Sequence, residues 1–294
     1  MTDVQPGILE PIPAHARYLS FALAGAGHPR GALRALGEQT DGSQTVVGIG
    51  LSLVEALGHR VPGLRTLPRI PGAKIEVPSE PEALWCWLRG DERGELLHRS
   101  RSIVKLLSPA FRVSRTVDAF NYGSGLDLTG FEDGTENPKG AAAIEVAVAT
   151  GLGAGLDGGS FVAVQQWLHD LDAFEKMSPD QQDNTFGRHR IGNEEIEDAP
   201  ASAHVKRTAQ ESFDPPAFVL RRSMPWMSER GAGLVFVAFG KSFDAFEALL
   251  GRMVGAEDGI TDALFTFSRP VTGAYFWCPP MKSGRLDLTA VIAA

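Results

Sequence analysis

The amino-acid sequence predicts an α+β protein made of two ferredoxin-like halves, each with an antiparallel sheet. Both halves of the 294-residue chain yield strands and helices in the order β-α-β-β-α-β, which defines the ferredoxin-like unit. A stretch rich in glycine and alanine, 140–160, lies between them. Apolar residues make up 43% of the chain, enough for a large core. We therefore expect an N-terminal half at 1–140 and a C-terminal half at 141–294.

The first half shows its elements through hydrophobic periodicity. Apolar runs and alternation predict strands, and apolar residues three or four positions apart predict helices. Strands are expected at 15–24, 45–52, 83–89 and 112–120. Helices are expected at 31–38 and 92–107. The order of these six elements is the ferredoxin-like order.

The second half gives a similar series. Strands are expected at 160–168, 203–209, 217–224, 233–239 and 262–269. Helices are expected to begin at 169 and to span 242–254, where Phe246, Leu250 and Met253 recur at helical spacing. The aromatic stretch 266–280 reads as a hydrophobic strand with an ordered end.

Charge and composition exclude several classes of protein. The formal net charge of −8 and pI near 5.4 disfavour nucleic acid and anionic membrane as partners. Cys86 and Cys278 form no C-x-x-C motif and predict buried thiols in a reducing compartment. The N-terminus lacks the pattern of a signal peptide, and no run of about 18 apolar residues is present. We therefore expect a cytoplasmic protein without a membrane span.

The segment T-G-F-E-D-G-T-E-N-P at 129–138 holds Asp133 between Gly130, Gly134 and Pro138. Asp-Gly is a common turn dipeptide, because glycine accepts a positive φ and aspartate bonds its own backbone. The alternative is a carboxylate held by a stiff loop and aimed at a reactive group. The spacing alone favours the turn and leaves both interpretations open.

Two further segments carry candidate chemistry. His204 lies in S-A-H-V-K-R, and none of the seven histidines belongs to an H-E-x-x-H zinc motif. In L-R-R-S-M-P-W, strand alternation puts Arg221 and Ser223 on one face and Arg222 on the other. These side chains are either solvated residues of a surface strand or a pair of donors facing an anion or polarised oxygen.

Taken together, these motifs resemble the dye-decolorising peroxidases. G-F-E-D-G-T-E-N-P at 130–138 is similar to the family's G-x-x-D-G signature. The chain also contains G-G-S-F-V-A-V-Q-Q-W-L-H-D-L, S-A-H-V-K-R, L-R-R-S-M-P-W and F-S-R-P-V-T-G-A-Y-F-W-C-P-P in the family's order. The resemblance extends from about residue 7 to Pro280. The compact length and missing export signal are similar to the bacterial cytoplasmic B-type subgroup.

The resemblance implies one haem b per chain, held between the halves and mainly by the C-terminal one. His204 matches the axial iron ligand, and Asp262 matches the acceptor of its second ring N–H. Arg188 matches an arginine near a haem propionate, and Arg207 is a second candidate partner for an anion. The apolar residues expected to line the proximal haem face are Phe246, Leu250, Met253 and Leu264.

On the distal side the resemblance matches Asp133 to the general base and Arg221 to the stabilising cation, with Ser223 where some relatives have asparagine. It implies that hydrogen peroxide oxidises the haem to a high-valent ferryl intermediate. Organic donors such as dyes and phenols then return it to rest in one-electron steps. It also implies a homo-oligomer. Donors too bulky for the pocket suggest surface oxidation, with Trp226 and Tyr275 as candidates.

Two other functions remain open from the sequence. A haem-handling protein, which binds porphyrin for transfer or iron release, predicts the same His204 ligation with only slow peroxide chemistry. A ferredoxin-like binding module without haem predicts no absorption band near 400 nm, where haem proteins absorb. The pairing of Asp133 with Arg221 favours the peroxidase, because a carrier has no use for a distal acid–base pair.

Overall fold

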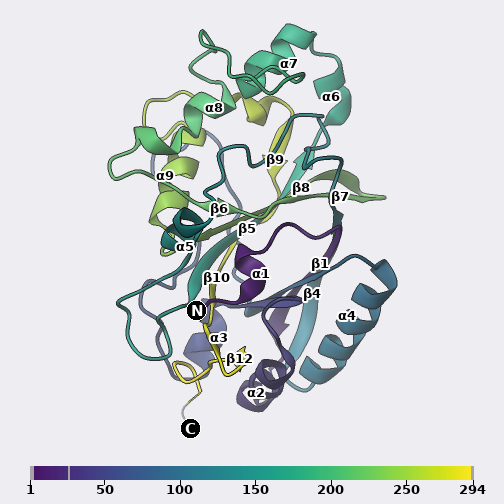
Figure 1. The fold of residues 1–294 in the computed structure, drawn as a ribbon, viewed down its shortest axis with the longest axis vertical. Coiled ribbons are helices and arrows are strands. Elements are labelled where there is room, and N and C mark those ends of the chain that lie inside the picture. The colour runs from purple at the N-terminus through teal and green to yellow at the C-terminus, as the bar shows by residue number, and fades with distance from the viewer. Residues whose placement is uncertain (1–2, 26, 293–294) are drawn as a thin grey trace.

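The computed structural model describes residues 3–25 and 27–292 and centres on one antiparallel sheet (Figure 1). The strand order is β6-β8-β7-β4-β1-β3-β2-β10-β5-β9, and β8 pairs in addition with β5. That extra pairing closes the eight strands from β8 round to β5 into a barrel. The sheet and its surrounding helices confirm the predicted α+β class.

The elements of the first part of the chain follow the predicted order. They are α1 (Pro6–Leu9), β1 (His15–Leu23), α2 (Pro29–Gln39), β2 (Thr45–Ile49), α3 (Leu51–Ala56), β3 (Leu84–Gly90), α4 (Arg93–Leu107), β4 (Phe111–Phe120) and α5 (Ala141–Ala147). Within the barrel their strands lie in the order β4-β1-β3-β2.

The second part supplies the other side of the barrel. Its elements are β5 (Ser160–His169), α6 (Leu171–Glu175), α7 (Pro179–Phe186), α8 (His204–Arg207), η1 (Gln210–Ser212), β6 (Leu220–Arg221), β7 (Met224–Ser228), β8 (Gly231–Gly240), α9 (Asp244–Met253), η2 (Ala263–Thr266), β9 (Ser268–Pro270), β10 (Ala274–Cys278), β11 (Met281–Lys282) and β12 (Arg285–Leu286). Read in the same direction round the barrel, its strands lie in the order β10-β5-β8-β7, which repeats the pattern of the first part. The two parts join at the pairs Ala119↔Trp226 and Ile49↔Trp277.

The interior of the barrel is filled by aromatic side chains. Trp87 of β3 stacks on Phe239 of β8 with ring centroids 6.3 Å apart, although these strands are not neighbours in the sheet. Tyr18 stacks on both Trp85 and Trp87. An eight-stranded barrel is just wide enough for side chains to fill it. Any large ligand must therefore bind outside the barrel.

Two predicted strands are wrong. Residues 203–209 contain the helical turn α8, because the Ala203 carbonyl accepts hydrogen bonds from the amides of Lys206 and Arg207. Half of 262–269 forms η2, because the Asp262 carboxylate caps the turn by accepting from the Leu264 amide, and only Ser268 and Arg269 belong to a strand, β9. At η2 a side-chain cap determined the conformation, and at α8 backbone hydrogen bonds close a single turn; short apolar runs reveal neither.

Helix α7 was missed, although its start carries a recognisable signal. Ser178 and Gln181 form a capping box, and Pro179 occupies the first helical position. The helix ends at Gly187, which has a φ of 80°. The segment is polar, so hydrophobic periodicity alone did not reveal it.

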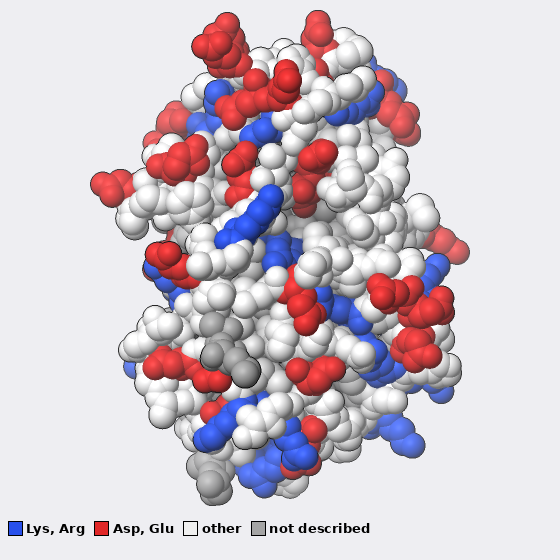
Figure 2. Space-filling model, in the orientation of Figure 1, with Lys and Arg blue, Asp and Glu red and all other residues white. Residues whose placement is uncertain are grey.

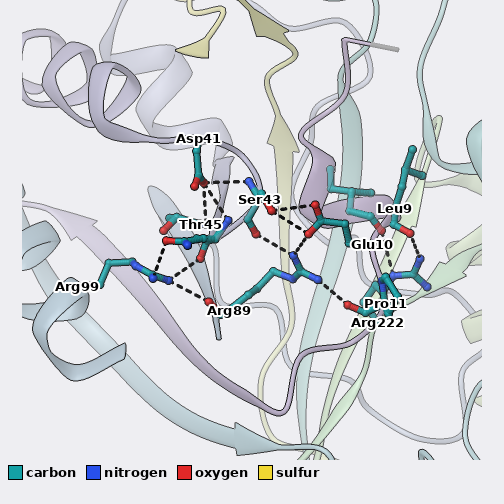
Figure 3. Close-up of polar contacts among 11 residues, drawn as sticks. Leu9, Glu10, Pro11, Asp41, Ser43, Thr45, Arg89, Arg99 and Arg222 are labelled. Carbon is teal, nitrogen blue, oxygen red and sulfur yellow. Dashed lines mark hydrogen bonds and ion pairs between the residues drawn. The ribbon is translucent and has the colours of Figure 1, made fainter. Parts of the chain in front are cut away.

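The buried Arg89 and the half-buried Arg222 join the first residues of the chain to the sheet (Figure 3). Arg89 of β3 donates to the Glu10 carboxylate and to the carbonyls of Ser43 and Pro11. Arg222 donates to the carbonyls of Ile8 and Leu9 in and beside α1. Burial and, to a smaller extent, the nearby charge of Arg89 lower the pKa of Arg222 to about 10.

Charged side chains are mixed over the surface. On the face drawn in Figure 2, acidic groups are prominent at the end of the molecule formed by α6, α7 and α8, with basic groups between them. Among the described residues, none of the helices is both long and apolar enough to cross a membrane.

Replacing Arg89 by methionine should lower the free energy of unfolding by about 3–5 kcal/mol, because the carboxylate and carbonyls that it now satisfies would lose their partner. The matched control is Arg99→Met, whose guanidinium bonds only backbone and amide oxygens at the edge of the same network. The control should cost about 1 kcal/mol or less. Urea denaturation of the variants measures the difference, and equal losses would contradict the role given to Arg89.

Candidate functional site

A cavity of about 450 Å³ lies against the outer face of the sheet, in the second part of the chain. Its walls are strands β5, β6 and β8, helices α8 and α9, and the loop that carries Asp133. The volume lies within the range usual for small-molecule and cofactor sites. The predicted site residues that line it are Asp133, Arg188, His204, Arg221, Phe246, Leu250, Met253 and Leu264.

Asp133 and Arg221 face each other in this cavity. Nη1 of Arg221 lies 3.3 Å from Oδ1 of Asp133, and both side chains are about one-fifth exposed. The Asp133 amide donates to the carbonyl of Gly125, which fixes the start of the turn. The carboxylate is therefore more than a solvent-facing turn residue, because it meets a fixed cation in a concave site.

The side-chain amide of Asn137 holds the Asp133 loop against the backbone of Arg221. Asn137 donates through Nδ2 to the Arg221 carbonyl at 3.0 Å and accepts through Oδ1 from the Arg221 amide at 2.8 Å. The Asn137 side chain thus pairs with β6 as a neighbouring strand would. Gly134 is required beside it, because its φ is 79° and a Cβ there would lie 2.9 Å from Asn137 Nδ2.

The other end of the same loop is anchored to the end of β5. His169 Nε2 lies 3.1 Å from Asp127 Oδ1, and the second Asp127 oxygen accepts from the amide and hydroxyl of Thr129. Burial raises the pKa of Asp127, but the hydrogen bonds from His169 and Thr129 outweigh it and hold this pKa below the ordinary 3.8. The loop therefore crosses the cavity wall with both ends fixed.

His204 opens α8 and lies in the cavity wall. Its Nδ1 is 2.7 Å from Oδ2 of Asp262, whose side chain is fully buried. The other Asp262 oxygen accepts from the Leu264 amide. Because an ionised carboxylate only accepts hydrogen bonds, Nδ1 carries the hydrogen in this pair, and Nε2 is the nitrogen that offers a lone pair when the ring is neutral. Asp262 thereby fixes the orientation of the His204 ring.

Arg188 lines the cavity and is already paired with acidic side chains. Its Nη2 donates to Glu136 at 2.9 Å and lies 3.6 Å from Glu195, while Nη1 donates to the Asn193 carbonyl. Asn193 in turn donates to Glu132 and Thr135 of the Asp133 loop. An anion bound at Arg188 would therefore compete with carboxylates that the chain itself supplies.

Three of the predicted site residues do not line the cavity: Asp262, which contacts His204 from behind the wall, Arg207 and Ser223. Arg207 is buried, and its guanidinium binds both oxygens of Asp258 at 2.8 Å and the Arg252 carbonyl. Ser223 is also buried, and its hydroxyl accepts from the Val237 amide within the sheet. Arg222 does lie on the opposite side from Arg221, as strand alternation predicted. The Ser223 hydroxyl does not face the cavity with Arg221, because it bonds the backbone of β8.

The two candidates for surface oxidation are not on the surface. Trp226 is 5% exposed and Tyr275 is 3% exposed. Trp226 donates to the Trp167 carbonyl, and Tyr275 stacks on Phe243 with centroids 3.9 Å apart. The prediction of a surface role for these two residues is wrong, because both pack into the core.

Sequence analysis missed several polar residues of the cavity. Gln165 on β5 is 2% exposed, and its Nε2 has no hydrogen-bond partner among the described residues. Asp127, His169 and Asn137 were also missed. Alternation along Q-Q-W-L-H puts Gln165, Trp167 and His169 on one face, so this signal was present in the sequence.

The two hydrogen bonds between the Asn137 side chain and the Arg221 backbone predict a local change in hydrogen exchange in Asn137→Ala. Hydrogen exchange of the Arg221 amide should accelerate at least tenfold, because the partner that accepts its hydrogen is gone. Gln5→Ala is a matched control, since the Gln5 amide binds both the N–H and the carbonyl of Val47 far along the sheet. The control should accelerate exchange at Val47 and leave Arg221 unchanged. Unaltered exchange at Arg221 in Asn137→Ala would show that other contacts hold β6.

The depressed pKa of Asp127 predicts a pH-dependent contribution to stability. A carboxyl whose pKa is lower in the folded chain stabilises it above the unfolded pKa, and this stabilisation is lost as the pH falls through the folded value. The free energy of unfolding of the wild type should therefore exceed that of Asp127→Asn by about 1–3 kcal/mol at pH 7. This difference should become smaller below pH 3.8. Urea denaturation at pH 7, 5 and 3 measures the gap, with the exposed turn variant Asp41→Asn as control. A constant gap would argue against the assigned ionisation.

Comparison with known proteins identifies the family. The model described as Dyp-type peroxidase, C-terminal, matches residues 125–283, more than half of the chain. A dye-decolorizing peroxidase of Mycolicibacterium paratuberculosis is 29% identical over 259 residues, covering 85% of this chain and 73% of that protein.

Solved structures agree with the sequence match. A putative dyp-type peroxidase from Shewanella oneidensis superposes with a TM-score of 0.84 and 28% identity, covering 93% of this chain and 95% of the other. A DypB variant from Rhodococcus jostii RHA1, solved in complex with heme, gives a TM-score of 0.82 and 28% identity over 92% and 95% of the two chains. The cavity described above thus lies in a chain that belongs to the DyP-type peroxidases, a family of peroxidase enzymes.

Proposed function

We propose that this chain is a haem b peroxidase that reduces hydrogen peroxide and oxidises organic donors, such as dyes and phenols, in one-electron steps. The observation that carries the proposal is that two pairs of residues lie at the same cavity. One is the His204–Asp262 pair, which leaves a nitrogen free to bind iron. The other is the Asp133–Arg221 pair, an acid–base group beside a fixed cation.

The residues of the cavity fit a porphyrin. Phe246, Leu250 and Met253 of α9, with Leu264, present an apolar wall beside His204, which suits the face of a large flat ring. The buried Nε2 of Gln165 offers a hydrogen bond that nothing in the described chain accepts. Buried donors are normally satisfied, so an orphaned one in a cavity wall supports a bound group. Arg188 is the candidate partner for a propionate.

When bound, haem would supply the redox chemistry, taking two oxidising equivalents from hydrogen peroxide and returning them to a donor one at a time. His204 would hold the iron through Nε2. Asp262 would fix the ring orientation and make the ligand a stronger electron donor, as acceptors of a ligating histidine do.

Asp133 would move the proton that peroxide cleavage requires. A carboxylate oxygen of Asp133 would accept the proton from one oxygen of hydrogen peroxide and return it to the other oxygen, which would then leave as water. Arg221 donates fixed hydrogen bonds to the negative charge that develops meanwhile. General acid–base catalysis of this kind is worth about 10²–10⁴ in rate, so its loss should be readily measured.

The architecture supports the remaining parts of the proposal. We assign the two repeated strand orders to two ferredoxin-like units, at 1–140 and 141–294, with haem bound mainly by the second. The cavity walls come almost entirely from the second unit, and the first contributes the Asp133 loop near its end. Membership of the B-type subgroup, a homo-oligomeric state and a cytoplasmic location stay predictions from the sequence.

Stopped-flow absorption of the haem-loaded protein mixed with hydrogen peroxide tests the proposal. Asp133→Ala and Arg221→Ala should each slow the peroxide step, and at least one should slow it tenfold or more. Asp118→Ala is a matched control, because Asp118 also pairs with an arginine, Arg17, away from the cavity. It should react at the wild-type rate. Haem binding with slow peroxide chemistry in all four proteins would favour a haem-handling protein instead.

A further inference from the structure

His169 stands in a wall shared by two spaces. It lines the central cavity, and it also lines an outer hollow of about 540 Å³. Phe267 and Ser268 are the other residues common to both linings. A single layer of side chains therefore separates the two spaces at this point.

The polar groups of this wall form one continuous chain of hydrogen bonds. Ser268 Oγ lies 2.7 Å from His169 Nδ1, and His169 Nε2 lies 3.1 Å from Asp127 Oδ1. The side chains of His169 and Asp127 are only 6% and 11% exposed. Ser268 and His169 line both spaces, whereas Asp127 lines the cavity alone, so the chain of bonds begins at a residue that touches the hollow and ends inside the cavity.

We propose that Ser268, His169 and Asp127 form a proton relay that carries protons from water in the outer hollow into the central cavity. The proposal rests on the peroxidase function above. Reduction of hydrogen peroxide to water consumes as many protons as electrons, and a donor that gives only electrons leaves the protons to come from solvent. A porphyrin in the cavity would fill the space through which water otherwise brings them.

The imidazole can perform this transfer with every proton accounted for. A proton from the hollow passes through the Ser268 hydroxyl to Nδ1, while the Nε2 proton passes to Asp127 and on into the cavity. The ring returns to its starting tautomer by rotating about its side-chain bonds, which carries the protonated nitrogen from the Ser268 side to the Asp127 side. The hydrogen bonds that lower the pKa of Asp127 make it a group that releases the proton readily. The other charged groups facing the hollow are Asp170, Asp172 and Arg269.

A purely structural role is the alternative, because Asp127 also anchors the loop that carries Asp133. The two roles affect different steps. Displacing the loop would move Asp133 and slow the reaction with peroxide, which uses the peroxide's own proton. Losing the relay would slow the later reduction by a donor, which needs protons from solvent.

The test is stopped-flow absorption of haem-loaded His169→Gln, with ferrocyanide as a donor of electrons alone. Glutamine keeps hydrogen bonds to both neighbours but cannot pass a proton through a ring. The relay predicts a peroxide step within twofold of wild type and a reduction step at least tenfold slower. The matched control is His189→Gln, whose histidine pairs with Asp183 at 2.9 Å but lines neither space. Equal slowing of both steps, or of neither, would overturn the relay.

A second readout needs no turnover and keeps the relay separate from the peroxidase proposal. In the resting haem-loaded chain, where the porphyrin would close the cavity side, exchange of the His169 ring N–H with water, followed by nitrogen NMR, should slow at least tenfold in Ser268→Ala. This variant leaves the contact with Asp127 and serves if His169→Gln does not fold. Unchanged exchange would overturn the route from the hollow. A wild type that exchanges quickly but does not react with peroxide would instead overturn the peroxidase function.

Discussion

The pairing of β5 with β8 is the constraint on which the rest of the structure depends. It runs over nine positions, from Phe161↔Gly240 to His169↔Ala232, and it closes the sheet. Closure leaves an interior that aromatic side chains fill, so the outer face of the same two strands has to carry the site. Gln165 and Trp167 from β5, with Leu234 and Phe236 from β8, form that face of the cavity. One ladder of hydrogen bonds thus excludes a ligand from the barrel and builds the wall outside it.

The Asp133 loop depends on that wall for its position. A loop of this length with several glycines has many conformations in isolation, and fixing one of them costs conformational entropy. The chain offsets this cost with polar contacts at both ends: Asp127 to His169 at the end of β5, and Asn137 to the backbone of Arg221 on β6. The carboxylate and the guanidinium are separated by more than 80 residues, yet the second contact ties the loop to the backbone of the residue that Asp133 faces. The motif D-G-T-E-N therefore carries both a reactive carboxylate and the amide that positions it.

Much of the fold could be predicted from periodicity, and its limits are visible at particular residues. Strands with strong alternation or continuous apolar runs, and amphipathic helices such as α4 and α9, were found close to their observed bounds. Elements that depend on caps or on a single hydrogen-bonded turn were not predicted. The sequence predicted strands where α8 and η2 lie, and it predicted no helix at α7. Closure of the barrel was also beyond the sequence, because periodicity shows which residues are buried but not which strands become neighbours.

The candidate site shows the same division. Resemblance brought His204, Asp262, Asp133 and Arg221 together, and the geometry places them in two hydrogen-bonded or ion-paired sets. The expectation of an anion partner failed for Arg207, because an arginine near His204 can pair with Asp258 as well as with a ligand. Spacing cannot distinguish these uses, since the partner lies 51 residues away.

Neutral amides and anionic carboxylates have different roles at this site: the amides bind backbone groups, and the carboxylates pair with histidine or arginine. Asn137, Gln210 and Gln165 are buried or half-buried amides near the cavity, and the first two bind backbone groups without adding charge. The glutamates of the cavity rim are exposed, whereas the buried or half-buried carboxylates are Asp127, Asp133 and Asp262, each of which meets a histidine or an arginine. A buried carboxylate without such a partner would be expensive, whereas a paired one keeps its acceptor oxygens in place. Amides therefore hold the backbone, and carboxylates orient or accept protons. A substitution of aspartate by asparagine at these positions changes the proton chemistry while leaving the shape of the wall nearly unchanged.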